Sequence, residues 1–208
     1  MQEPYVEAGK NCEFQHGCIV GFRYKPDCYP FRIGNDGRIR AGTIIYGDVQ
    51  AGDDFQTGHN VMIREFTFFG SHIVIGTNTI IDGNVSVGNF VKIESNVYIP
   101  THVRIGSRVF IGPGVVMTND KYPQKMRDEY EPEGPILEDG VTLGGGVVMV
   151  PGITIGRGSF VAAGAVVTKN VPPMTFVKGV PCEFFPMPEN LKELNIAKNW
   201  RKYINEKN

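Results

Sequence analysis

The residues best suited to chemistry in this 208-residue chain are concentrated in one polar stretch, residues 118–136. An amide and a carboxylate stand side by side there, Asn119 and Asp120, and such groups can orient a nucleophile or take its proton. Three further polar and aromatic residues follow them: Lys121, Tyr122 and Arg127. Cations suit phosphate groups and aromatic rings suit flat bases. The same residues are also common in solvated turns, so both interpretations stay open.

The polar stretch interrupts a repeat of six residues. Every sixth residue from Ile33 to Met117 is large and apolar except Ala51 and Thr57, and the repeat resumes from Leu137 to Val167. A second apolar column stands two residues earlier: Val85, Val91, Val97, Val103, Val109 and Val115. Helices repeat every 3.6 residues and half-buried strands every two, so a period of six indicates very short strands joined by turns. Such units bury their apolar face only by stacking.

Three such strands would form one triangular coil of about 18 residues, and about eight coils would stack as parallel strands about 4.8 Å apart. Glycine and asparagine tolerate positive φ at corners, and Asn60, Asn78 and Asn96 follow one another at intervals of one such coil. Fifteen consecutive sixes argue against a β-sandwich with coincidental spacing. We therefore expect an all-β parallel coil over residues 1–185, with residues 118–136 as an external loop.

Both ends of the chain depart from the repeat. Residues 189–206 carry apolar side chains at about every third position, which predicts an amphipathic helix in a C-terminal tail, residues 186–208. Residues 21–31 predict a short lateral insertion. Cys12, His16, Cys18 and Cys28 raise the alternative of a zinc site. Cys12 and Cys18 fall on the inward column, however, which favours small buried side chains over metal ligands.

The composition argues against several classes of partner. Twenty-one basic and 22 acidic residues give a net charge of −1, so neither nucleic acid nor an anionic membrane is favoured. No apolar run approaches the ~20 residues of a membrane span. The N-terminal residues lack the basic start and apolar core of a signal peptide. We therefore expect a cytoplasmic protein with reduced cysteines.

The repeat resembles that of the hexapeptide-repeat acyltransferases. The segments that carry this resemblance most clearly are IGSRVFIGPGVV at 105–116 and ITIGRGSFVAAGAVVTKNVP at 153–172. It covers roughly residues 6 to 185 and implies a left-handed parallel β-helix that works as a homotrimer. The handedness follows from the resemblance alone, since general crossover rules favour the opposite hand. Such a repeat specifies the fold strongly and the reaction weakly.

A finer resemblance concerns the segments IESNVYIP at 93–100 and GPGVVMTNDKYP at 112–123. They are similar to the sugar-nucleotide N-acetyltransferases, which use acetyl-CoA to acetylate an amine on a UDP- or dTDP-linked amino sugar. The asparagine of TND lies beside the amine in that family, which implies this role for Asn119. We expect Asp120 to stack one coil above His102, and either could take a proton or orient groups. The acceptor would contact Arg64, Lys121, Tyr122 and Arg127.

The same resemblance implies a site for acetyl-CoA in the groove between adjacent prisms. The pantetheine arm would bond to the backbone at Gly144, Ala163 and Thr168, where small side chains allow close approach. Lys169 and Lys178 match the positions of cations for the nucleotide phosphates. Tight turns of the coil explain the small residues as well. No metal is expected.

Several alternatives stay open at this point. A sugar O-acetyltransferase needs a base for its hydroxyl acceptor, and His102 or His59 could serve. Related O-acetyltransferases often carry a histidine in the external loop, whereas residues 118–135 contain none, which favours an amine. A γ-type carbonic anhydrase needs three zinc histidines, and the four here are too scattered: His16, His59, His72 and His102. A non-catalytic assembly module would not need so long a loop.

Overall fold

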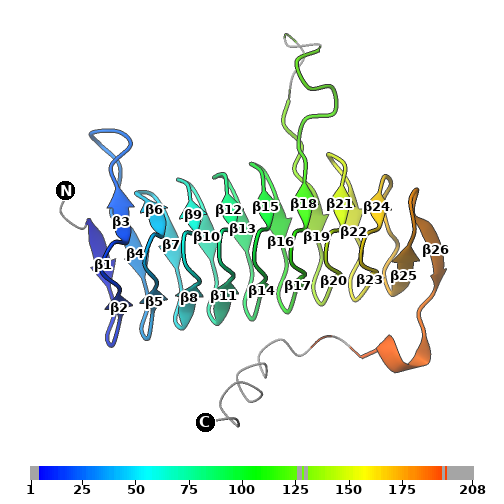
Figure 1. Ribbon diagram of the computed structural model, residues 1–208, viewed down its shortest axis with the longest axis horizontal. Helices are drawn as coiled ribbons and strands as arrows, with labels where there is room; N and C mark the ends of the chain where they lie inside the picture. The colour runs from blue at the N-terminus through cyan, green and yellow to red at the C-terminus, as the bar shows by residue number, and fades with distance from the viewer. Residues whose placement is uncertain (1–4, 126–127, 129–130, 194, 196–208) are drawn as a thin grey trace.

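The computed structural model describes residues 5–125, 128, 131–193 and 195. Within these residues the chain winds into a prism with three β-sheets as its sides, as predicted for a left-handed parallel β-helix (Figure 1). All strand pairs are parallel except the last, β25 with β26. Eight strands in each of two sheets confirm the expected eight coils.

The strands are short, and each sheet takes one strand from every coil. Sheet A consists of β1 (Val6–Ala8), β4 (Phe31–Ile33), β7 (Gln50–Ala51), β10 (Phe68–Phe69), β13 (Ser86–Val87), β16 (Arg104–Ile105), β19 (Ile136–Leu137) and β22 (Thr154–Ile155). Sheet B consists of β2 (Glu13–Phe14), β5 (Arg38–Ile39), β8 (Phe55–Thr57), β11 (Ile73–Ile75), β14 (Lys92–Ile93), β17 (Phe110–Ile111), β20 (Thr142–Leu143), β23 (Phe160–Val161), β25 (Thr175–Lys178) and β26 (Glu183–Pro186). Sheet C consists of β3 (Ile19–Phe22), β6 (Ile44–Tyr46), β9 (Met62–Ile63), β12 (Ile80–Ile81), β15 (Tyr98–Ile99), β18 (Val116–Met117), β21 (Val148–Met149) and β24 (Val166–Val167).

The two apolar columns of the sequence fill the interior of the prism. Ile80 of β12 pairs with Tyr98 of β15, so successive coils are in register at an offset of three repeats. Every sixth residue from Ile33 to Met117 is buried, including the two smaller exceptions. The valines of the second column are at most 1% exposed. Because both columns point inward, each coil buries its apolar side chains against the coils above and below it.

Corners of the coil adopt the left-handed backbone that the asparagine spacing predicts. Asn60, Asn78 and Asn96 have φ of 54°, 58° and 60°. Their side chains form a ladder, in which Asn60 Nδ2 donates to Asn78 Oδ1 and Asn78 Nδ2 donates to Asn96 Oδ1, both at 3.3 Å. Asparagine suits this place because it tolerates positive φ and has both a donor and an acceptor.

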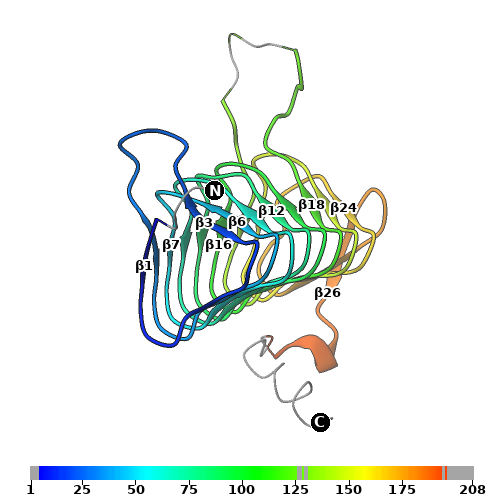
Figure 2. The same cartoon turned by 60° about the vertical axis from the view of Figure 1, so that its left-hand side comes forward.

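Two loops project from the same edge of the prism, where sheet C passes into sheet A (Figures 1 and 2). The N-terminal one is the predicted lateral insertion, residues 23–30, between β3 and β4. The second, residues 118–135 between β18 and β19, is the predicted external loop, which we call the excursion. Arg104 pairs with Ile136 across it, so the usual offset of 18 between paired positions rises to 32.

The repeat is weakest where a coil lacks a neighbour. In the first coil Ala8 is exposed and Phe14 half-buried, because coils pack against them on one side only. Near the other end a 3₁₀ turn spans Glu189–Leu191, and most of the helix predicted for 189–206 lies outside the described residues. No helix among the described residues is long and apolar enough to cross a membrane.

Replacing Asn78 tests the corner ladder. We expect Asn78→Ala to lower the free energy of unfolding by about 1–2 kcal/mol for the left-handed backbone and by about 1 kcal/mol more for the lost amide bonds. Asn78→Gly should lose less, since glycine adopts this φ freely. Denaturant unfolding of the three proteins measures both effects. Equal stability of the alanine and glycine variants would contradict the backbone argument.

Candidate functional site

The excursion begins at a residue whose side chain is held by the coil below. Asn119 is half-buried, and its Nδ2 donates to Thr101 Oγ1 at 2.8 Å and to the Thr101 carbonyl at 3.3 Å. A carbonyl only accepts hydrogen bonds, so the amide must turn its nitrogen toward Thr101. The amide oxygen Oδ1 then points elsewhere and has no partner among the described residues. It is an oriented acceptor.

Asp120 is a turn residue in the structure. Its Oδ1 accepts a hydrogen bond from the Tyr122 backbone N–H at 2.9 Å, which closes a short turn at the start of the excursion. The expectation that Asp120 stacks directly above His102 is wrong. Gly134 occupies that place, because a Cβ added to it would lie 2.4 Å from the His102 carbonyl carbon. The chain leaves the coil after Asn119 and rejoins it at Glu133, whose N–H donates to the Asn119 carbonyl.

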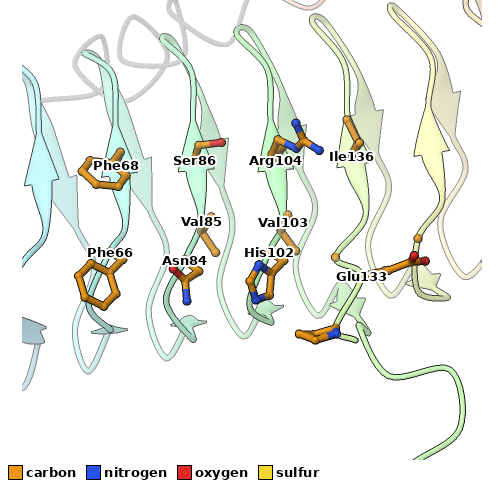
Figure 3. Close-up of a pocket in the computed structure, with 13 residues that line it drawn as sticks. Phe66, Phe68, Asn84, Val85, Ser86, His102, Val103, Arg104, Glu133 and Ile136 are labelled. Atoms are coloured by element: carbon orange, nitrogen blue, oxygen red, sulfur yellow. The ribbon is translucent and has the colours of Figure 1, made fainter. Parts of the chain in front are cut away.

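A cavity of about 630 Å³ lies on the outer face of sheet A beside the excursion. Its lining comes from five successive coils, and we call it the sheet A groove. Figure 3 shows two rows of side chains along it. One row consists of Phe66, Asn84 and His102, and the other of Phe68, Ser86, Arg104 and Ile136. Each coil contributes one side chain to each row.

The sheet A groove contains His102 and adds residues that the sequence analysis did not identify. His102 is exposed, has a φ of 67° and donates its N–H to the Asn84 carbonyl. Asn119 does not line the groove, but it bonds to Thr101, the neighbour of His102, and to Glu133, which lines the groove. Glu133 was missed because the whole excursion separates it from Asn119, and the spacing of the repeat predicts no contact across such a loop.

The other predicted acceptor residues lie outside this lining. Arg64 forms ion pairs with Glu65 at 2.8 Å and with Asp82 at 3.4 Å, and the hydrogen bond to Glu65 raises the pKa of Arg64. Arg64 is therefore already paired with two carboxylates. Lys121 lies over the ring of Tyr122, 5.5 Å from its centroid, and both are exposed. Arg127 lies outside the described residues.

The lateral insertion docks beside the other end of the groove. Tyr24 stacks edge-on against Phe66, with ring centroids 6.3 Å apart, and its hydroxyl donates to Asp48 Oδ2 at 2.6 Å. Burial and this hydrogen bond to a carboxylate raise the pKa of Tyr24. A second cavity of about 280 Å³ lies here, and it shares Phe66 and Phe68 with the sheet A groove. The lateral insertion therefore borders a cavity that adjoins the sheet A groove at Phe66 and Phe68.

The predicted acetyl-CoA residues lie on other parts of the prism. Gly144 and Ala163 are neighbours on successive coils where sheet B passes into sheet C, since a Cβ on Gly144 would lie 2.4 Å from the Ala163 nitrogen. Thr168 and Lys169 follow β24, and Lys169 Nζ lies 4.6 Å from the centroid of the Phe184 ring. Lys178 ends β25 and lies equally close to Phe185. The structure thus brings Gly144 and Ala163 together, at a different corner from Asn119.

The cysteines belong to the core and its N-terminal end. Cys28 and Cys182 are buried, whereas Cys12 and Cys18 are half-buried and pack against the core. Burial raises the pKa of the Cys18 thiol, which disfavours the thiolate that a metal requires. Across the part of the chain that the structure describes, no group of three or more His, Cys, Asp or Glu side chains could hold a metal ion.

Comparison with known proteins identifies the repeat. The family described as "Bacterial transferase hexapeptide (six repeats)" matches residues 84–119 and 134–169, the coils on either side of the excursion. A crystal structure from Bacillus cereus, described as a putative acetyltransferase, is 18% identical, covers 91% of this chain and 95% of its own, and superposes with a TM-score of 0.56. That likeness shows a shared fold. Residues 84–119 and 134–169 therefore carry repeats of the hexapeptide type, on a fold shared with that structure.

Curated relatives match one segment only. A Schizosaccharomyces pombe protein, likewise described as an acetyltransferase, is 44% identical over 54 residues, 26% of this chain and 26% of that protein. The 2,3,4,5-tetrahydropyridine-2,6-dicarboxylate N-acetyltransferase of Staphylococcus aureus is 46% identical over 48 residues, 23% of this chain and 20% of that protein. The chain therefore spans about a quarter of the length of the curated relatives it matches.

The raised pKa of Tyr24 predicts a pH dependence of stability. Its folded-state pKa exceeds the ordinary value of about 10, so the stabilisation is fully present below pH ~10 and is lost as the pH rises toward the folded-state pKa. We expect the free energy of unfolding of the wild type to fall above pH ~10, and that of Tyr24→Phe to fall less. Denaturant unfolding at several pH values measures this. Identical slopes in the two proteins would rule out the Tyr24 contribution.

Proposed function

We propose that this protein is an acetyl-CoA-dependent N-acetyltransferase that acts on the amino group of a nucleotide-linked, UDP- or dTDP-type amino sugar. The acetyltransferase names of its hexapeptide-repeat relatives support acetyl transfer. The oriented amide of Asn119 supports an amine acceptor. Its Oδ1 faces away from Thr101 and is an acceptor suited to an N–H group.

The reaction places few demands on the protein. A neutral amine attacks the thioester carbonyl carbon, a tetrahedral intermediate forms, and the C–S bond breaks to release coenzyme A thiolate. The attacking nitrogen gains positive charge as it bonds to carbon, so an acceptor on its N–H becomes more favourable in the transition state. Asn119 Oδ1 would supply that acceptor and aim the lone pair at the thioester. No strong base is required.

The surplus proton has several possible destinations. The His102 imidazole, at the corner next to Thr101, is one candidate to take it, and the departing thiolate is another. Asp120 is engaged by the Tyr122 N–H, which suits a role in shaping the turn more than proton transfer. An O-acetyltransferase remains the rival proposal, with His102 or His59 as base. Glu133 offers a carboxylate in the same groove for either acceptor.

A homotrimer would unite the two halves of this site. Asn119 lies where sheet C meets sheet A, whereas Gly144 and Ala163 lie where sheet B meets sheet C. Sheet C is the side between these corners. If three prisms turn sheet C toward a common axis, the first corner of each protomer approaches the second corner of its neighbour. Acetyl-CoA held along Gly144, Ala163 and Lys178 at the second corner of one protomer would then reach the acceptor of the next. Thr168 and Lys169 lie across sheet C, at the first corner.

The outer face of sheet C is suited to such packing. One outward side chain per coil forms an apolar stripe, which consists of Ile19, Ile44, Met62, Ile80, Tyr98, Val116, Val148 and Val166. Ile80, Tyr98 and Val116 are 36–37% exposed in the single chain. Sheet A carries charged or polar residues at many equivalent places, for example Arg32, Gln50 and Ser86. A continuous exposed apolar stripe on one side marks a contact surface.

Substitution of Asn119 tests the proposed role. We expect Asn119→Ala to lower kcat/KM for an amino-sugar nucleotide by about 10- to 100-fold, the effect of losing one hydrogen bond to a charged group. Thr101→Val, which removes one of the two anchors of the amide, should lower it less. Release of free thiol from acetyl-CoA, measured against a panel of UDP- and dTDP-amino sugars, reports the rate.

The histidines provide the matched control for that assay. His59→Gln, at a distant corner, should leave the rate unchanged, and His102→Gln should alter the pH profile if His102 receives the proton. An unchanged kcat/KM in Asn119→Ala would refute the role of Asn119. Turnover with hydroxyl acceptors and none with amines would replace the proposal by the O-acetyltransferase.

Charges placed on the apolar stripe test the trimer. We expect Ile80→Asp to shift the protein from a trimer toward a monomer in light scattering, because a carboxylate cannot be buried at low cost in an apolar contact. Acetyl transfer should fall with it, since each site would need two protomers. Val74→Asp, on the outer face of sheet B, is the control. A wild-type monomer with full activity would refute this arrangement.

A further inference from the structure

The side chains of the sheet A groove change character from coil to coil. Phe66 and Phe68 stand at one end, Asn84 and Ser86 on the next coil, and Arg104 with His102 on the third. The excursion closes the far end at Glu133 and Gly134. Aromatic, neutral polar and cationic groups therefore follow one another along the prism axis (Figure 3).

The aromatic end is exposed, although Tyr24 packs against the edge of Phe66. Phe66 is 41% exposed and Phe68 46% exposed, although both are large and apolar. Phe66 also stands at a corner with a φ of 58°, where the coils before and after it carry Asp48 and Asn84. A bulky residue in left-handed backbone is strained. Exposed aromatic faces in a groove suit a flat ring that stacks on them.

The cationic position is available for an anion. Arg104 forms no ion pair among the described residues, in contrast to two other arginines of the prism. Arg32 pairs with Glu7, and Arg64 pairs with Glu65 and Asp82. An exposed, unpaired guanidinium beside His102 can bind phosphate oxygens in a bidentate manner.

The spacing of the coils matches an elongated ligand. Successive parallel strands lie about 4.8 Å apart, so Phe66 lies roughly 10 Å from His102 and roughly 14 Å from Gly134 along the axis. One sugar ring cannot span that length. A base, a ribose, a diphosphate and a sugar joined in a row can occupy one coil each.

We propose that the sheet A groove binds the nucleoside diphosphate part of the acceptor, with the base against Phe66 and Phe68 and the diphosphate at Arg104. Asn84 and Ser86 lie between them and face the ribose hydroxyls. The amino sugar then lies under the excursion, near Glu133 and beside Asn119. This orientation rests on the proposed function for the class of acceptor. It assigns specificity to Phe68 and Arg104, which lie outside the acetyl-CoA positions.

Binding of UDP, dTDP and inorganic pyrophosphate to the full-length protein tests the inference without turnover. We expect Phe68→Ala to weaken UDP binding about tenfold and to leave pyrophosphate binding unchanged. Arg104→Gln should weaken both by about tenfold. Phe110 is an aromatic residue on the outer face of sheet B, and Phe110→Ala should change neither the UDP affinity nor the pyrophosphate affinity. Phe68→Leu keeps the apolar bulk without the ring and should weaken UDP binding as Phe68→Ala does. Calorimetry measures the affinities of all the variants.

The outcomes separate this inference from the proposed function. UDP binding that neither Phe68→Ala nor Arg104→Gln weakens would overturn the groove assignment, even if acetyl transfer to a nucleotide amino sugar is found. Absence of UDP and dTDP binding would overturn it as well, and would leave acetyl transfer to a free amine possible. Groove-dependent UDP binding in a protein without acetyltransferase activity would support the subsite and refute the proposed function.

Discussion

The register between successive coils is the constraint on which the rest of the structure depends. Each coil is too thin to bury its own apolar side chains, so the inward columns become a core only when the next coil lies directly above. Hydrogen bonds between parallel strands maintain that alignment, and the asparagine ladder repeats it at a corner. Any inserted residue must leave the coil and return without shifting the register. The excursion meets this requirement, because Arg104 pairs with Ile136 as though the extra residues were absent.

The same constraint leaves the outer surface free to carry functional side chains. Inward positions take apolar residues or, at a few places such as Thr57 and Thr79, a buried hydroxyl side chain, whereas outward positions and corners vary freely from coil to coil. Side chains that are one coil apart in the sequence become neighbours in a row, so a groove can carry a different group at each step. The insertion and the excursion project from one edge. Tyr24 of the insertion packs against Phe66 of the groove, and Glu133 of the excursion lines the groove. An elongated acceptor and a long cofactor arm are both suited to a rod-shaped protein of this kind.

Several site residues show which contacts the spacing of the repeat can predict and which it cannot. Thr101 and Asn119 are one coil apart in the sequence, and a hydrogen bond joins their side chains in the structure. Asp120 was expected above His102 by the same count, but Gly134 lies there because the chain departs at Asn119 and the count no longer applies. For the same reason the spacing of the repeat did not indicate Glu133 as a site residue. The aromatic pair Phe66 and Phe68 gave no signal in the sequence, since exposed and buried phenylalanines look alike there.

The sequence by itself determined the coil, its eight turns, the corner asparagines and the position of the excursion, because a period of six acts at short range and repeats many times. Tertiary structure decided which outward residues share a groove, which way the Asn119 amide points, and that Arg64 is paired while Arg104 has no ion pair among the described residues. These features depend on where the chain re-enters the coil and on contacts between side chains from distant coils. Neither is encoded in a local period.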